Sequence, residues 1–300
     1  MAASITNTRV NPMKISLLGT GLLGSAVVER LLAQGHEVMV WNRDAAKVAA
    51  LADKGARMAA TAAEALAASE LTLLFLADRA AIEAVLLTPE SRAALAGRVV
   101  LQMGTIGPAD SRALNDALIA GGARYAECPV LGSLPEARAG TLILMFGGDE
   151  ALYGQLQPML LDLGPEPRRI GAVGQAAALK LAMNQLIASE TSAFAMSLAL
   201  VQASGVKVED FMQILRGSAL YAPTFDKKLD RMLSGNYAGP NFPLDHLIKD
   251  VRLFIRAAEA AGIDTSPLAS LEAVVAEVSV AGHGGEDYSV LARGFMPNSR

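Results

Sequence analysis

Three glycines at the spacing G-x-G-x-x-G stand near the start of the chain, in the order Gly19, Thr20, Gly21, Leu22, Leu23, Gly24. They follow a short apolar run and open an apolar segment of helical periodicity. In that context the first glycine permits a tight turn, the second lets the backbone approach a pyrophosphate, and the third lets helix and strand pack closely. The helix N-terminus then offers N–H groups to the phosphates. The pattern predicts a dinucleotide site rather than an ordinary glycine turn.

The end of the second apolar run indicates which dinucleotide this would be. Glu37–Trp41 is followed by Asn42 and Arg43, where an NAD site would carry an acid for the ribose hydroxyls. Asp44 comes next, but it falls in the first turn of a predicted helix, where acids cap anyway. The guanidinium of Arg43 can hold a 2′-phosphate instead. The pattern therefore predicts NADP(H), whereas a merely solvated Arg43 would leave NAD as the cofactor.

A lysine and an asparagine one helical turn apart form a second candidate group. Lys180 and Asn184 share a face of an apolar helix that is entered through Gly171 and Gly174. Desolvation lowers the pKa of an ammonium group, which can then donate a proton to a developing alkoxide. Composition alone favours the other interpretation, in which Lys180 extends to solvent.

Two further segments carry weaker signals. Glu127–Ser133 ends in a small-residue turn that could present N–H groups to an anion, although a simple loop is the favoured interpretation. In Phe242–Asp250 the neighbours Lys249 and Asp250 begin an amphipathic helix, where a surface ion pair is the usual interpretation. Cys128 has no base at a motif spacing, so we expect a small buried residue there.

The composition excludes several classes of protein. The 300 residues are 52% hydrophobic and 19% charged, which excludes a disordered chain. With 26 basic and 30 acidic residues the net charge is −4, which does not indicate nucleic-acid binding. The single cysteine excludes an internal disulfide framework, and three scattered histidines predict no metal site.

The elements that must position these residues alternate in the first half of the chain. Strands are predicted at Lys14–Leu18, Glu37–Trp41, Leu71–Leu76, Arg98–Gln102, near Arg124–Ala126 and near Leu142–Phe146. Helices are predicted at Leu22–Ala33, Asp44–Asp53, Thr61–Ser69, Ala80–Leu87 and Ala109–Ala120. Such alternation predicts an α/β fold with a mostly parallel sheet.

After Gly174 the strand signal disappears. A long helix, Gln175–Ser204, is apolar on nearly every face, so we expect it to be buried, partly against a second copy in a homodimer or homotetramer. We place the boundary in the loop Pro165–Gly174, which gives domains of residues 13–174 and 175–300. Further helices are predicted at Val208–Leu215, Pro223–Leu233, Leu244–Ala261 and Ser266–Ala281.

Neither a membrane span nor an export signal is predicted. The best candidate span, Leu186–Val201, contains a glutamate and several hydroxyl residues, so it would not face lipid. Met1–Pro12 is polar and lacks the apolar core of a signal peptide. We therefore expect a soluble cytoplasmic protein.

The four motifs, in this order, resemble the β-hydroxyacid dehydrogenase family, also called the 3-hydroxyisobutyrate dehydrogenase family. The likeness runs from Lys14 to about Leu291. Trp41–Arg43 and Phe242–Asp250 look most like the branch of glyoxylate and succinic semialdehyde reductases. The resemblance implies a Rossmann domain, a long inter-domain helix, an all-helical second domain and an oligomer.

The resemblance also implies roles for single residues. Lys180 would be the catalytic acid and base, and Asn184 would orient it or the substrate. The remaining residues would bind the substrate carboxylate (Gly132, Ser133), lie by the nicotinamide and substrate (Thr105), line the cofactor (Leu76, Ala77), and close over cofactor and substrate (Lys249, Asp250). The family usually has serine where this chain has Leu131, and often where it has Gly104.

The expected activity is NADPH-dependent reduction of a small aldehyde acid, such as glyoxylate or succinic semialdehyde. The alternatives are oxidation of a 3-hydroxy acid such as 3-hydroxyisobutyrate, imine reduction, and a non-catalytic NADPH-binding module. The related imine reductases lack the lysine, so Lys180 argues against imine reduction. The Lys180–Asn184 pair argues against the non-catalytic module.

Overall fold

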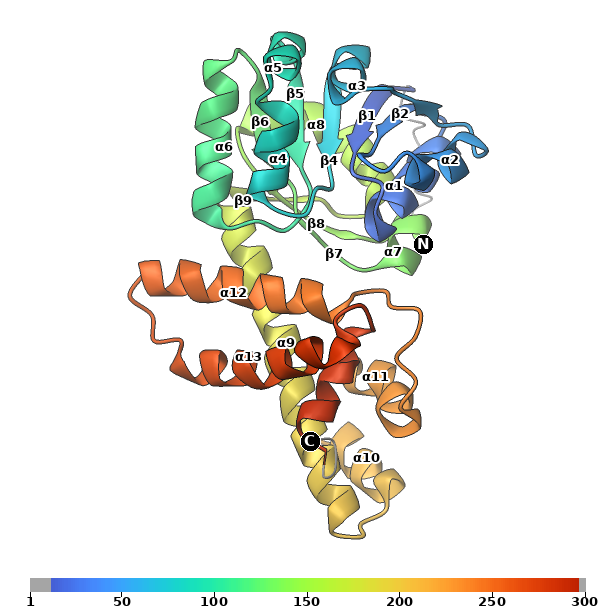
Figure 1. The fold of residues 1–300 in the computed structure, drawn as a ribbon, viewed down its shortest axis with the longest axis vertical. Helices are drawn as coiled ribbons and strands as arrows, with labels where there is room; N and C mark the ends of the chain where they lie inside the picture. Colours follow the sequence, from blue (N-terminus) through green and yellow to red (C-terminus); the bar gives the residue numbers. More distant parts are fainter. Residues whose placement is uncertain (1–11, 297–300) are drawn as a thin grey trace, which may run out of the picture. The chain divides into compact units, whose positions relative to one another are not determined.

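A computed structural model of the chain describes residues 12–296 (Figure 1). The segment on which the absence of a signal peptide was predicted lies, except for Pro12, outside the described residues. The chain divides into two compact units between Lys180 and Leu181. Each unit is described by itself below.

The first unit is built on a sheet in which six parallel strands follow the order β3-β2-β1-β4-β5-β6. A further strand, β8, runs antiparallel to β6 and β7 and parallel to β9. The mostly parallel α/β fold is therefore confirmed. The strands are β1 Lys14–Leu18, β2 Glu37–Trp41, β3 Arg57–Met58, β4 Leu71–Leu74, β5 Val99–Gln102, β6 Arg124–Glu127, β7 Val130–Leu131, β8 Ile143–Gly147 and β9 Arg168–Gly171.

Three of these strands, β3, β7 and β9, were not predicted. They are two to four residues long, too short to show alternation in the sequence. Strand β9 lies inside Pro165–Gly174, so the prediction of a plain loop there is wrong. The predicted strand Leu71–Leu76 ends at Leu74, because the chain leaves the sheet before the next helix.

Eight helices connect the strands. The predicted helix from Asp44 begins only at Ala46, because Asp44 forms a turn whose carboxylate accepts the N–H of Ala46. Helices α5, α7 and α8 were not predicted, and Pro158 inside α8 disguised its pattern. The helices are α1 Leu22–Ala33, α2 Ala46–Ala52, α3 Ala62–Ala68, α4 Arg79–Leu86, α5 Pro89–Leu95, α6 Pro108–Ala120, α7 Leu134–Ala139 and α8 Glu150–Leu163.

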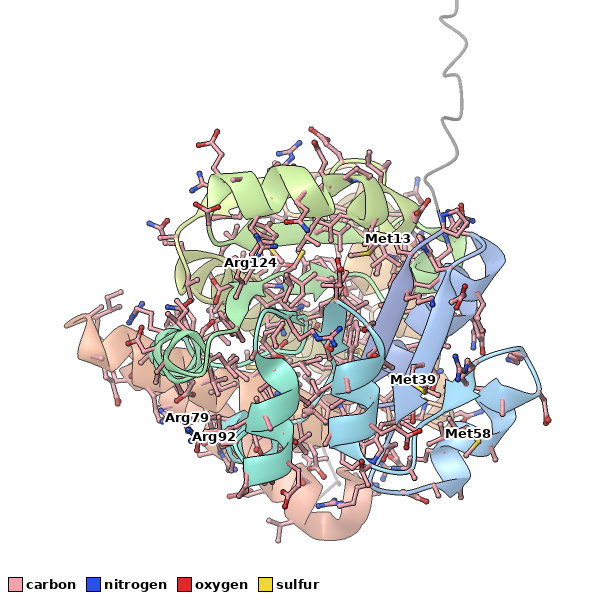
Figure 2. All side chains as sticks on the ribbon, turned by 90° about the horizontal axis from the view of Figure 1, so that it is seen from above. Met13, Met39, Met58, Arg79, Arg92 and Arg124 are labelled. Carbon is pink, nitrogen blue, oxygen red and sulfur yellow. The ribbon has the colours of Figure 1, made fainter. Side chains whose placement is uncertain are left out.

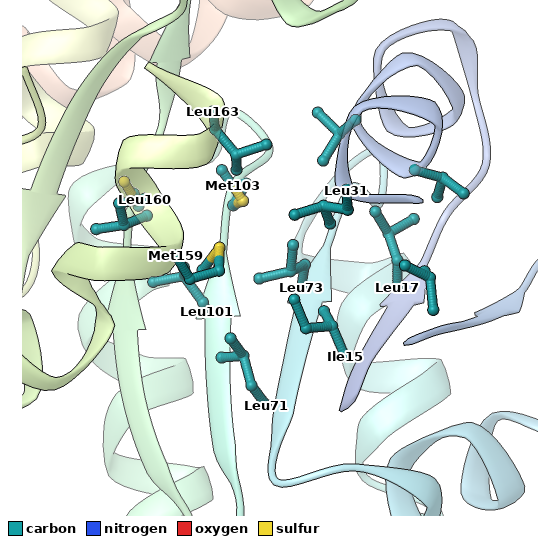
Figure 3. Packing of buried hydrophobic residues seen from close by; sticks show 14 of the residues in the cluster. Ile15, Leu17, Leu31, Leu71, Leu73, Leu101, Met103, Met159, Leu160 and Leu163 are labelled. Carbon is teal, nitrogen blue, oxygen red and sulfur yellow. The ribbon is translucent and has the colours of Figure 1, made fainter. Parts of the chain in front are cut away.

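Alternating strand residues divide the core into two layers. Ile15 and Leu17 of β1 pack with residues of α1 and α8 on one face (Figure 3). Leu18 packs on the other face with residues of α3 to α6. Exposed charged side chains such as Arg79 and Arg92 lie outside these layers (Figure 2). The hydrophobic layers hold the carboxyl ends of the strands at one edge of the sheet.

The second unit is helical, and no strand is present among its residues 181–296. Its core is formed by apolar residues of all five helices and includes Phe194 stacked on Phe225, with ring centroids 4.7 Å apart. The helices are α9 Gln175–Ala203, which begins in the first unit, α10 Val208–Arg216, α11 Pro223–Ser234, α12 Leu244–Ala260 and α13 Ser266–Val278. A π-turn, Ser279–His283, and a 3₁₀ helix, Tyr288–Gly294, follow.

Within the single chain α9 is buried only in part, and its coverage by a second copy stays a prediction. Leu186, Met196 and Leu200 are 45%, 48% and 69% exposed. By length and composition α9 would also suit a membrane span. Its buried side, however, carries Thr191 and Ser192 and joins the core of the second unit. These are features of a core helix in a folded domain.

Candidate functional site

The glycine loop has the geometry of a phosphate-binding turn. Gly19 has φ of +102°, and a Cβ there would lie 2.4 Å from the carbonyl oxygen of Phe75. A Cβ at Gly24 would lie 2.1 Å from the carbonyl oxygen of Gly19. Gly21 is exposed, and a Cβ there would meet nothing within 4 Å. Packing therefore requires the first and third glycines, while the second leaves open space for a ligand.

Hydrogen bonds fix this loop to the end of β2. The N–H of Gly19 donates to the carbonyl oxygen of Trp41 at 3.0 Å, and the amide of Asn42 donates to Oγ1 of Thr20 at 3.0 Å. Helix α1 begins after Gly21 with no side-chain cap from the described residues. Its first N–H groups therefore point to the loop, where they fit a pyrophosphate.

Beyond the loop, the predicted 2′-phosphate ligand Arg43 is exposed. Its neighbour Asp44 donates its N–H to Oδ1 of Asn42 at 2.9 Å and accepts the N–H of Ala46 at 3.1 Å. The carboxylate of Asp44 thus accepts a hydrogen bond in the turn that precedes α2. That Arg43, and not the acid, meets the adenosine ribose stays a prediction.

Apart from Lys249, which lies in α12 of the second unit, the remaining predicted cofactor residues lie just after the carboxyl ends of β1, β4 and β5. Strand β1 separates the two halves of the strand order, so this edge is where dinucleotides bind in such sheets. Leu22 and Ala77 are exposed there, whereas Leu23, Leu76 and Thr105 are half-buried.

The structure leaves little room for a side chain at Gly104. A Cβ there would lie 2.9 Å from the carbonyl oxygen of Leu76 and 3.2 Å from the side-chain nitrogen of Gln102. The loops after β4 and β5 therefore approach each other too closely for an unadjusted side chain. Gln102 is 1% exposed, and its amide has no hydrogen-bond partner within residues 12–296, a feature that the sequence did not reveal.

The turn expected to hold a substrate carboxylate contains a carboxylate of its own. Gly132 has φ of +121°, and both the N–H and the hydroxyl of Ser133 donate to Oε2 of Glu136 at 2.8 Å. Glu136 was not predicted as part of this turn, although the spacing S-x-x-E indicates such a capping pair. A substrate anion would have to replace Glu136 on these donors.

Helix α9 carries Lys180 and, one turn on, Asn184. Lys180 is half-buried at the end of the first unit. In the second unit, Asn184 is 2% exposed and its amide nitrogen donates to Oδ2 of Asp250 at 2.6 Å. The ammonium of Lys249 lies 3.0 Å from Oδ1 of Asp250. The structure thus brings Asn184, Lys249 and Asp250 together.

This cluster differs from a surface ion pair in two ways. The side chain of Asp250 is only 3% exposed, so it is held inside the second unit. The carbonyl oxygen of Asn184 is also buried and accepts no hydrogen bond from the described part of the chain. Because its nitrogen is committed to Asp250, this oxygen is oriented as an acceptor for a hydroxyl or ammonium group.

Two other expectations concern chemistry away from these groups. Cys128 is fully buried, and burial raises the pKa of its thiol well above the usual range. It is therefore no nucleophile under physiological conditions. Within residues 12–296 no cluster of three or more histidine, cysteine or acidic side chains could hold a metal ion.

The fold and the glycine loop define a class: a dinucleotide-binding domain of the Rossmann type followed by a helical domain. Two family models match the chain. Residues 14–174 match the NAD-binding domain of 6-phosphogluconate dehydrogenase, and residues 174–295 match the NAD-binding domain of NADP-dependent 3-hydroxyisobutyrate dehydrogenase.

Individual proteins agree with these models. Glyoxylate/succinic semialdehyde reductase 1 of Arabidopsis thaliana is 30% identical over 93% of this chain and 97% of its own. The cytokine-like nuclear factor N-PAC of Xenopus tropicalis is 30% identical over 94% of this chain, which spans about half the length of that protein. The structure of 3-hydroxyisobutyrate dehydrogenase from Salmonella typhimurium covers 94% of this chain and 99% of its own with a TM-score of 0.83 at 23% identity.

The chain belongs to the β-hydroxyacid dehydrogenase family, as its motifs predicted. The predicted cofactor, NADP(H), is confirmed at the level of the family. The site residues predicted for this chain stay predictions, to which the geometry above adds contacts.

Proposed function

We propose that this protein is an NADPH-dependent reductase of small aldehyde acids, with glyoxylate and succinic semialdehyde as the first candidates. The observation that carries the proposal is the arrangement on α9. Lys180 is followed one turn later by a buried Asn184, whose amide is fixed by Asp250 at 2.6 Å. The relative from Arabidopsis thaliana, named for these two substrates, supports the choice of substrate.

Bound NADPH supplies the hydride in this reaction. Lys180 donates a proton to the oxygen of the carbonyl group as negative charge develops there. Asn184, held by Asp250, presents its carbonyl oxygen as a fixed acceptor that orients the ammonium or the substrate hydroxyl. Because Asn184 does not have to rearrange, little free energy is lost in orienting it during the reaction.

The direct test is the loss of NADPH absorbance with a panel of aldehydes. Glyoxylate and succinic semialdehyde should be reduced faster than aldehydes of similar size without a carboxylate. The reverse assay with 3-hydroxyisobutyrate and NADP⁺ tests the alternative, oxidation of a 3-hydroxy acid. NADPH binding without turnover on either panel would instead support the non-catalytic module.

We further propose that the protein is a cytoplasmic homodimer or homotetramer. The exposed apolar residues of α9, namely Leu186, Met196 and Leu200, lie within one side of the helix and would be covered by a second copy. Light scattering at micromolar concentration should give at least twice the monomer mass of 31.2 kDa. A stable monomer would contradict the oligomer, and recovery of the protein with membranes on fractionation would contradict the location.

A further inference from the structure

A buried carboxylate lies beneath the first turn of α9. Glu127, the last residue of β6, is 1% exposed. Its Oε1 accepts the N–H of Gly174 at 2.8 Å and the N–H of Ala177 at 2.9 Å. Its Oε2 accepts a hydrogen bond from the hydroxyl of Ser111 in α6. One carboxylate therefore connects a strand, α6 and the start of the helix that carries Lys180.

The surroundings leave this carboxylate little freedom. A Cβ at Gly147 of β8 would lie 2.6 Å from Oε1, so only glycine there leaves room for Glu127. On the other side, the hydroxyl of Ser111 is 2.8 Å from the buried hydroxyl of Tyr125. These contacts fix both oxygens of Glu127. Through them they fix the N–H of Gly174, which precedes α9, and the N–H of Ala177 in its first turn.

A glutamate at position 127 would cost desolvation free energy without benefit if its role were only packing. Burial raises the pKa of Glu127, although Ser111 and the N–H groups of α9 act in the opposite direction. An apolar side chain would join β6 to α9 without the desolvation of a carboxylate. What an apolar contact cannot do is fix the direction of N–H groups, as a hydrogen-bonded carboxylate at a helix N-terminus does.

We propose that Glu127 is a positioning residue for Lys180. Lys180 follows Ala177 by three residues, a rise of about 4.5 Å along a rigid helix. A shift or rotation of the first turn therefore moves the ammonium group by a similar amount. Misplacement of a reacting group by about 1 Å costs on the order of a hundred-fold in rate. The proposal rests on the catalytic role proposed above for Lys180.

Two substitutions separate position from charge. Glu127→Gln keeps a carbonyl oxygen that can accept the N–H groups of Gly174 and Ala177. Its amide nitrogen can donate to the hydroxyl oxygen of Ser111, and the hydroxyl of Ser111 can then donate to the hydroxyl of Tyr125. Glu127→Asp keeps the charge but is one methylene too short to reach α9. We expect Glu127→Gln to retain at least about a third of kcat, and Glu127→Asp to lose roughly ten- to a hundred-fold. The KM for NADPH should not change in either variant, because the glycine loop holds the phosphates.

Thr88→Ala is the matched control for general loss of stability. Thr88 caps α5 by accepting the N–H of Ser91 at 3.2 Å, and α5 packs against α3 and α4. This variant should lower Tm and leave kcat unchanged. If Glu127→Asp is folded and keeps the kcat of the unchanged protein, or if Glu127→Gln is as slow as Glu127→Asp, the proposal is overturned.

Two measurements keep the test decisive. If Glu127→Asp does not fold, Ser111→Ala removes one donor only and should lower kcat about three- to ten-fold, with unchanged kcat counting against the proposal. Hydrogen exchange of the amides of residues 174–180 requires no substrate. Faster exchange in the Glu127→Asp variant supports the contact of Glu127 with the start of α9 even if none of the aldehydes is reduced. The absence of turnover would then contradict only the proposed function. Unchanged exchange would overturn the proposal that Glu127 positions the start of α9.

Discussion

The glycine loop and the Asn184–Asp250 cluster are built by opposite means. The loop uses backbone: Gly19 and Gly24 are required by close contacts, and Gly21 leaves open space. The cluster uses side chains, an amide and a carboxylate that are both buried and joined at 2.6 Å. A backbone site survives most side-chain changes, whereas a buried polar cluster depends on each partner. Cofactor binding and chemistry should therefore fail separately when single residues are changed.

The largest expected effect is on chemistry. Lys180→Ala should lower kcat about 10²- to 10⁴-fold, the usual contribution of a general acid, while the affinity for NADPH remains. Lys180→Arg should not restore the rate, because guanidinium stays protonated and transfers its proton poorly. Stopped-flow or steady-state NADPH oxidation, with cofactor binding followed by fluorescence, measures both quantities.

Lys180→Met is the informative control for this variant. It fills similar space without an ionisable group, so it should be as slow as Lys180→Ala if the lysine is catalytic. Retention of more than about a third of kcat in Lys180→Ala would remove Lys180 from the mechanism. A parallel loss of NADPH affinity would instead show that Lys180 also contributes to cofactor binding.

The next effect in size is on the cofactor. Arg43→Ala should weaken NADPH binding roughly ten- to a hundred-fold, because a charge-assisted contact to the 2′-phosphate is lost. Binding of NADH should hardly change, since it lacks that phosphate. Titration of both cofactors gives the two dissociation constants, and equal affinity of the unchanged protein for NADH and NADPH would contradict the role of Arg43.

The same contrast explains what the sequence could predict. The strands β1 and β2 and the helix α1 were predicted with their observed bounds, because the glycine spacing and the apolar periods are local. The end of α13 was placed too late, because the chain continues from Val278 as a π-helical turn, Ser279–His283, which an apolar period does not distinguish from an α-helix. Local signals therefore found the elements around the glycine loop, but they missed β3, β7, β9, α5, α7 and α8 of the same unit.

Contacts between distant residues could not be predicted in this way. Glu127 accepts hydrogen bonds from Gly174 and Ala177, which follow it by 47 and 50 positions in the sequence. Asn184 donates to Asp250, which follows it by 66 positions. No spacing rule covers such separations. The resemblance to a family named Asn184 and Asp250 as site residues, but it did not show that they are hydrogen-bonded or that Asp250 is buried.

The smallest expected effect concerns Glu136. It tests whether the turn at Ser133 binds the substrate. Both donors of Ser133 are bound to Oε2 of Glu136 at 2.8 Å, so a substrate carboxylate competes with an anion of the chain itself. Glu136→Ala removes the competitor. The KM for glyoxylate should then fall about three- to ten-fold, the value of one exchanged hydrogen bond, with kcat unchanged.

An uncharged aldehyde serves as the internal control, because it makes no demand on these donors and its KM should not change. Glu136→Gln keeps an acceptor for Ser133 but removes the charge, so its effect should lie between those of the unchanged protein and Glu136→Ala. Loss of the capping pair of α7 should lower Tm slightly in Glu136→Ala, whereas Glu136→Gln keeps the pair and should leave Tm nearly unchanged. A higher KM for glyoxylate in Glu136→Ala would mean that Glu136 shapes the turn for the substrate rather than competing with it. In that case Glu136, like Asp250, would be a side chain on which substrate binding depends.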